Sequence, residues 1–184
     1  MTRRLVLMAL AAATLPSLAP AGDPARLPAT LNVTLTKDLA ADPATVWAVI
    51  GDFQDMSWHP AVHAGTGSGG NGAGATRRLV PGGADGPTID EALDSHSPAT
   101  LRYAYRITGV ALEVLPVTQG SSHLRVTPRD GDGATVAWRG DFHRGDPDTD
   151  PPEGLDDAVA IAAVSDVYQA GLDALAARFG APAP

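Results

Sequence analysis

The most constraining feature of the sequence is a succession of short segments in which apolar and polar residues alternate, and from residue 75 to residue 143 no helical pattern separates them. Alternation with a period of two is typical of a β-strand with one buried face. Clusters of Gly, Pro and Asp separate most of the segments, and hairpin turns are sufficient to connect antiparallel strands. The sequence therefore predicts an antiparallel meander, with strands at residues 31–39, 75–80, 88–94, 100–108, 117–127 and 134–143.

Two helices are expected outside the meander. Asp42 can accept amide hydrogen bonds as an N-cap, and Pro43 suits the first helical position, so a short helix begins here and ends at Gly51. From Leu155 to Gly180 the apolar residues recur every three or four positions, which predicts a long amphipathic helix lying on an apolar surface. Its expected buried stripe consists of Ile161, Val164, Tyr168, Leu172, Leu175 and Phe179.

Composition excludes several classes of function. The formal charge is −8 and Lys37 is the one lysine, which argues against nucleic-acid binding because phosphate contacts need a basic face. The chain has no cysteine, so disulfides, thiolate nucleophiles and zinc-thiolate sites are excluded. No motif calls for a cofactor. Two G-x-G-x-x-G matches between Gly65 and Gly74 precede a strand rather than a helix, and this segment is interpreted as a flexible loop.

The first residues have the layout of a secretory signal peptide. Arg3 and Arg4 precede an apolar run, and Ala19-Pro20-Ala21 supplies the small residues of a cleavage site. The prediction is a signal peptide at residues 1–21, an extended leader at 22–30, one domain at 31–180 and no membrane span after cleavage. We therefore expect a periplasmic or secreted protein whose formal charge changes from −8 to −10 on loss of the two arginines.

Several motifs together resemble a known superfamily. They are the segment 41–53, Trp58-His59-Pro60, Glu91-Ala-Leu93, the Val-x-Trp-x-Gly-x-Phe pattern at 136–142 and the closing helix. This combination resembles the START-like superfamily, also called SRPBCC or polyketide-cyclase-like proteins. The resemblance implies an α+β helix-grip fold, in which a seven-stranded antiparallel sheet wraps around a long C-terminal helix and apolar ligands enter the cleft. Together with the signal peptide, the same set of motifs is similar to that of the MxaD-type periplasmic accessory proteins of bacterial methanol oxidation.

The candidate ligand-binding residues lie on the expected inner face. Alternation places Tyr103 and Tyr105 on one face of their strand, and Trp138 and Phe142 repeat that geometry. Core packing is the alternative reading for these aromatic residues. The full candidate set is Trp58, His59, Glu91, Tyr103, Tyr105, Trp138, Phe142 and Tyr168.

Glu91 and His59 each have a structural and a functional interpretation. Glu91 is a carboxylate on an otherwise apolar inward face, so it either forms a hydrogen bond to a neighbouring turn, to Trp58 or to His59, or it contacts a ligand. By the resemblance, Trp58 and His59 lie near the opening of the cavity. His59 is either a structural hydrogen bonder or, together with Glu91, a general acid and base.

An acidic segment before the last helix suggests one metal alternative. Asp146, Asp148, Asp150 and Asp157 match positions 1, 3, 5 and 12 of a calcium loop. Pro151 stands where such a loop needs Gly, so a solvated acidic loop is the competing interpretation.

Two functional hypotheses follow. The first is a non-catalytic periplasmic START-like protein that binds a small apolar ligand, or that acts on a periplasmic oxidoreductase as an accessory factor. The alternative is a cyclase or dehydratase that uses the same cleft, with His59 and Glu91 moving protons.

Overall fold

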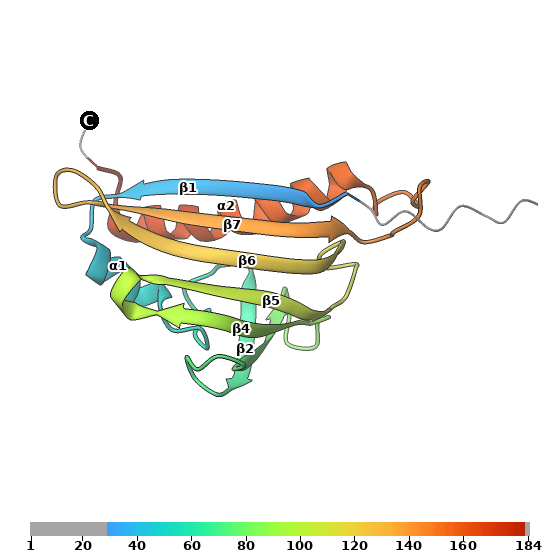
Figure 1. Ribbon diagram of the computed structural model, residues 1–184, viewed down its shortest axis with the longest axis horizontal. Helices are drawn as coiled ribbons and strands as arrows, with labels where there is room; N and C mark the ends of the chain where they lie inside the picture. The colour runs from blue at the N-terminus through green and yellow to red at the C-terminus, as the bar shows by residue number, and fades with distance from the viewer. Residues whose placement is uncertain (1–28, 183–184) are drawn as a thin grey trace, which may run out of the picture.

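One seven-stranded antiparallel sheet dominates the computed structural model, which describes residues 29–182. The strands lie in the order β1-β7-β6-β5-β4-β3-β2, so the first strand pairs with the last and the others follow as a meander. Figure 1 shows that the sheet is strongly twisted, because β2 lies across the direction of β1. The strands are β1 (Leu31–Leu39), β2 (Val62–Ser68), β3 (Thr76–Pro81), β4 (Ile89–Ser97), β5 (Arg102–Val110), β6 (Val117–Pro128) and β7 (Ala134–Arg144).

The long helix α2 (Asp157–Phe179) packs against this sheet and contacts β1 and β7. In Figure 1 it runs behind these two strands. Its buried residues are Ala160, Val164, Tyr168, Gly171, Leu172 and Leu175. The predicted α+β helix-grip fold is confirmed.

Capping residues define both ends of α2. Asp156 accepts a hydrogen bond from the Val159 amide, and the Gly180 amide donates to the Ala176 carbonyl. The placement of Ile161 in the buried stripe was wrong: its side chain is 38% exposed, and Ala160 occupies the core position one residue earlier.

The short helix α1 (Pro43–Ile50) closes one end of the structure and buries Val46 and Ile50. The Asp42 carboxylate accepts hydrogen bonds from the amides of Ala44 and Thr45, each at 3.0 Å, which confirms the predicted N-cap. A single turn of 3-10 helix, η1 (Pro98–Thr100), separates β4 from β5, so β5 begins two residues later than the alternation indicates.

The prediction of a loop from Gly65 onward was wrong for its first half, which forms β2. Gly65 and Gly67 pair with Leu79 and Arg77 of β3. A Cβ atom at Gly67 would collide with the Gln54 side chain and the Thr76 carbonyl, so glycine permits a close approach of two backbones. Strand formation depends on backbone hydrogen bonds, and these two glycines provide them without a hydrophobic pattern.

Hydrogen bonds hold the remaining glycine-rich turn against neighbouring segments. The Asn71 side-chain oxygen accepts a hydrogen bond from the Phe53 amide at 2.8 Å, and the Gln54 side chain donates to the Gly70 carbonyl at 3.1 Å. The Gly74 amide donates to the Leu93 carbonyl at 2.8 Å. These bonds connect the turn to the segment after α1 and to β4.

By length and composition alone, α2 would be sufficient to cross a membrane. It is instead the helix held by the sheet, with Leu172 and Leu175 at 0% and 1% exposure. A core helix can pass the same test of length and composition as a membrane span, and here the sheet covers the apolar face of α2. The signal peptide predicted at 1–21 and most of the 22–30 leader lie outside the described residues.

The packing of α2 gives a first prediction. We expect Leu172→Ala to lower the free energy of unfolding by about 2–5 kcal/mol, because the lost methyl groups leave a cavity between helix and sheet. Ile161→Ala on the same helix is the control and should change it by less than about 0.5 kcal/mol, because Ile161 faces solvent. Urea denaturation of both variants is the measurement. Equal losses would contradict this packing.

Candidate functional site: a cavity beside a buried ion pair

A cavity of about 230 Å³ lies between the inner face of the sheet and α2. Residues of β3 to β7, of α2 and of the two loops around Met56–Val62 and Val114–Leu115 line it. Most of the lining side chains are apolar. The polar groups on the wall are few and belong to His59, Arg77, Glu91, Tyr105, Ser121, Ser122 and Tyr168.

The strongest interaction on the wall is a buried ion pair between neighbouring strands. Arg77 of β3 and Glu91 of β4 are register partners, so both side chains project from the same face of the sheet. The Arg77 Nε donates to Glu91 Oε2 at 2.5 Å, and the two side chains are 1% and 8% exposed. An unpaired charge at this depth would be costly, and each of these two charges provides the partner that the other needs.

The rest of the Arg77 guanidinium is enclosed by protein. Its Nη1 donates to the Phe53 carbonyl at 2.7 Å. The plane lies over the Phe53 ring at 4.2 Å and the Tyr105 ring at 4.9 Å, both within range of a cation–π contact. Among the described residues, Arg77 Nη2 and the Tyr103 hydroxyl are the fully buried side-chain polar atoms without a hydrogen-bond partner.

The pair changes the protonation of both partners. Burial lowers the pKa of Arg77, but Glu91 and the two neighbouring tyrosines outweigh it and raise this pKa above its ordinary value. Burial raises the pKa of Glu91, and the Arg77 charge opposes that rise. Arg77 therefore keeps its proton, and the pair has no net charge when Glu91 is ionised.

His59 is held by backbone groups on both sides of its ring. It precedes β2 and is 2% exposed. Its Nε2 lies 2.9 Å from the Val167 carbonyl of α2, and its Nδ1 accepts a hydrogen bond from the Ala61 amide at 3.2 Å. The neutral tautomer with the proton on Nε2 satisfies both contacts. Burial lowers the pKa of His59 below the ordinary value of 6.5, and the Arg77 charge adds to this effect.

Two glycines allow α2 to approach these rings. A Cβ atom at Gly171 would lie 2.6 Å from His59 Cδ2 and 2.9 Å from Trp138 Cζ3, so only glycine fits where the helix crosses the two rings. A Cβ atom at Gly140 of β7 would collide with the Tyr168 hydroxyl. Glycine at both positions thus allows the helix to lie close to β7.

Aromatic side chains form the central part of the wall. The rings of Trp138 and Tyr168 stack with centroids 4.4 Å apart. The Trp138 Nε1 donates to the Tyr105 hydroxyl at 3.1 Å, and the Tyr168 hydroxyl and Ser122 Oγ are 2.7 Å apart. Burial raises the pKa of both Tyr105 and Tyr168, so both phenols keep their protons.

Comparison with known proteins agrees with this geometry. The family model described as polyketide cyclase / dehydrase and lipid transport matches residues 30–180. The chain belongs to this family. The resemblance to the START-like, SRPBCC superfamily is therefore confirmed. No curated protein matches the chain.

Solved structures of other proteins have the same fold. XoxI from Bacillus cereus is 27% identical, with a TM-score of 0.67 and an alignment that covers 80% of this chain and 94% of XoxI. A putative uncharacterized protein from Bacillus thuringiensis is also 27% identical, with a TM-score of 0.67 over 81% of this chain and 98% of that one. A protein from Thermobifida fusca is 29% identical, with a TM-score of 0.65 over 81% of this chain and 93% of its own.

This member of the polyketide cyclase / dehydrase family brings most of the candidate residues to the cavity. His59, Glu91, Tyr105, Trp138, Phe142 and Tyr168 line it. Trp58 and Tyr103 do not, which for Tyr103 corresponds to the packing alternative. The Trp58 Nε1 donates to the Asp55 carbonyl at 3.2 Å, and its ring lies against those of His59 and Trp138. Tyr103 packs against Trp47 and Phe53.

The sequence reasoning missed Arg77. It predicted the strand 75–80, and alternation there places Arg77 on the same face as Ala75 and Leu79, which are both buried. Arg77 is thus a cation on the inward face of β3, and Glu91 is a carboxylate on the inward face of the adjacent strand β4. Taken together, the two inward charges on adjacent strands indicate an ion pair.

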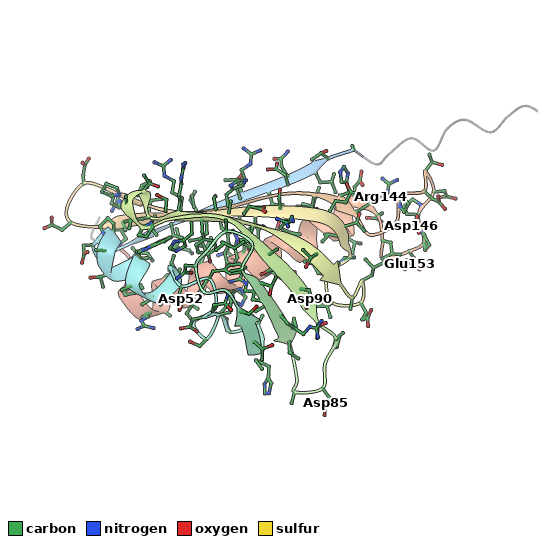
Figure 2. The ribbon with its side chains drawn as sticks, turned by 60° about the horizontal axis from the view of Figure 1, so that its bottom comes forward. Asp52, Asp85, Asp90, Arg144, Asp146 and Glu153 are labelled. Carbon is green, nitrogen blue, oxygen red and sulfur yellow. The ribbon has the colours of Figure 1, made fainter. Side chains whose placement is uncertain are left out.

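The acidic segment that matches the calcium-loop spacing contacts an arginine. Arg144 lies at its base, where Nη1 donates to the Asp157 carboxylate at 2.9 Å and Nε donates to the Asp146 carbonyl at 2.8 Å. Within residues 29–182, no three His, Asp or Glu side chains are placed to hold a metal ion. Figure 2 shows Asp146 and Glu153 on a loop that projects beyond the end of β7, close to Arg144.

The environment of His59 predicts a pH dependence of stability. Because its folded-state pKa lies below the unfolded value of 6.5, the unfolded chain takes up the proton first as pH falls. Its contribution is therefore complete above about pH 6.5 and is lost as pH falls through the lowered folded-state pKa. Urea denaturation between about pH 7 and about pH 5 should show a smaller loss of stability for His59→Gln than for the wild type.

His63→Gln is the matched control, because His63 is exposed two residues beyond the Ala61 amide. It should retain the wild-type pH dependence. If His59→Gln loses as much stability as the wild type between about pH 7 and about pH 5, then His59 is not buried in its neutral form.

Proposed function

We propose that this protein binds a small, largely apolar molecule in the cavity between the sheet and α2. The observation that carries the proposal is the mostly apolar wall around a volume of about 230 Å³. Apolar surface gains free energy when it leaves water, and a few polar groups on the wall are sufficient to orient the molecule. The family description includes lipid transport, which fits such a ligand.

The polar groups favour binding over proton transfer. Both ring nitrogens of His59 contact backbone groups, and its lowered pKa reflects a site that disfavours the protonated ring. A general base in a cyclase or dehydratase needs a nitrogen or oxygen free to take a substrate proton. Both nitrogens of His59 are engaged, so a proton shuttle between His59 and Glu91 lacks one of its two members, although Glu91 Oε1 is not bonded to Arg77.

A cavity-filling variant tests the proposal. We expect the wild type to bind the neutral fluorescent probe N-phenyl-naphthylamine with one site per chain. Val164→Phe should weaken this binding about tenfold or more, because Val164 is a buried residue of α2 on the cavity wall and a phenyl ring would occupy the space. The measurement is fluorescence titration, with thermal unfolding as a check that the variant is folded.

Ile161→Phe provides the control on the same helix, since Ile161 faces solvent and does not line the cavity. It should bind the probe as the wild type does. The proposal fails if the wild type binds no probe, or if a folded Val164→Phe binds it with wild-type affinity.

We further propose that the protein works in the periplasm or outside the cell, as the signal-peptide pattern at residues 1–21 indicates. Fractionation of the source cells checks this, and a chain that keeps Met1 in the cytoplasm would contradict it.

The acidic loop favours an accessory role as a second candidate function. Asp146 and Glu153 lie on the projecting segment shown in Figure 2, and Asp148 and Asp150 lie between them in the sequence. Such an acidic surface attracts a basic protein through complementary charge. A periplasmic oxidoreductase, or its basic electron acceptor, is the partner that the MxaD-type resemblance suggests. Replacing these four acids by Asn or Gln should weaken that binding and reduce its salt dependence. Unchanged binding would remove the loop from this role.

A further inference from the structure

Two polar atoms on the cavity wall have unused hydrogen-bonding capacity. Glu91 Oε2 accepts from Arg77 Nε, but no described residue donates to Glu91 Oε1. The Tyr105 hydroxyl accepts from Trp138 Nε1, and no described residue accepts the Tyr105 proton. Glu91 and Tyr105 both line the cavity, so the wall includes one residue with an unpaired acceptor and one with an unpaired donor.

These two groups are neighbours on the sheet. In the pairing of β4 with β5, Glu91 lies opposite Ile107 and Leu93 lies opposite Tyr105. Glu91 and Tyr105 are therefore diagonal neighbours on one face, a separation that long side chains bridge readily. The Arg77 guanidinium contacts both, through the ion pair to Glu91 and the stacking on the Tyr105 ring. Glu91 and Tyr105 therefore border the same part of the cavity wall.

The charges on the wall select against an ionic ligand. Arg77 uses two of its five N–H donors, on Glu91 and on the Phe53 carbonyl, and its side chain is 1% exposed, so the remaining donors are not accessible to an anion in the cavity. An anionic head group would lie beside the Glu91 carboxylate, and no accessible donor would offset the repulsion between the two negative charges. A cationic head group would add a second positive charge to a carboxylate that Arg77 already neutralises.

We propose that the cavity recognises the hydroxyl group of an uncharged, otherwise apolar alcohol, which donates to Glu91 Oε1 and accepts from the Tyr105 hydroxyl. This inference rests on the proposed function and adds the chemical class of the ligand. The volume of about 230 Å³ exceeds the roughly 150 Å³ that holds a benzene molecule in an engineered protein cavity, so an eight-carbon alcohol is a suitable size.

Isothermal titration with two isomers tests the proposal. Octanol has a hydroxyl group, whereas heptyl methyl ether has the same atoms and the same size but no donor. We expect octanol to bind about tenfold or more tightly than the ether, because a hydrogen bond to a charged acceptor is lost in the ether. Octanoate and octylamine should both bind more weakly than octanol.

Variants then assign the preference to the two residues. Tyr105→Phe should reduce the preference for octanol over the ether at least severalfold. Glu91→Gln should do the same, because it removes the charge of the acceptor. Tyr103→Phe is the matched control: Tyr103 lies on the same strand and face, is 2% exposed and does not line the cavity, so its loss of a hydroxyl should leave the preference unchanged.

The outcomes separate this inference from the proposed function. Equal affinities for octanol and the ether, or tighter binding of octanoate or octylamine, would overturn the hydroxyl site and leave the apolar cavity standing. Failure of all four ligands, together with failure of the fluorescent probe, would overturn both. A preference for octanol that survives in a folded Tyr105→Phe would also overturn the assignment, whether or not Glu91→Gln folds.

Discussion

Arg77 and Glu91 place two opposite charges 2.5 Å apart inside a small domain whose other buried groups are mostly apolar. Neither charge could remain there alone, since desolvation of an isolated ion costs several kcal/mol or more. The pair therefore requires β3 and β4 to keep a register that makes the two residues direct partners. It also holds the segment after α1 in place, because Arg77 Nη1 donates to the Phe53 carbonyl.

The cavity depends on a second constraint, which is the distance between α2 and the sheet. Glycines at 140 and 171 let the helix approach β7, while the Trp138 and Tyr168 rings stack between the two layers. The Nε2 of His59 lies within hydrogen-bond distance of the Val167 carbonyl of α2, which connects the loop before β2 to the helix. The ion pair and these contacts together form a polar region on one part of the wall, and most of the rest is apolar. This arrangement suits a ligand with one polar group.

Much of the fold could be predicted from the sequence, because its signals are local. The Asp42 cap, the glycines that end both helices and the alternation of β5 and β7 all act within a few residues. β2 could not be predicted in this way, since its residues contribute backbone pairing and almost no buried side chains. Arg77 was missed for a different reason: alternation places it on the inward face of its own strand, but its role as the partner of Glu91 appears only when the two adjacent strands are considered together.

The most direct test of this account is the coupling free energy between Arg77 and Glu91 in a double-mutant cycle. Urea denaturation would give the unfolding free energies of the wild type, Arg77→Met, Glu91→Leu and the double variant. The account predicts that each single variant loses about 3–5 kcal/mol, because it leaves an unpaired charge, and that the double variant loses much less than the sum of the two. Additive losses would show that the two side chains do not form the buried pair on which the cavity wall depends.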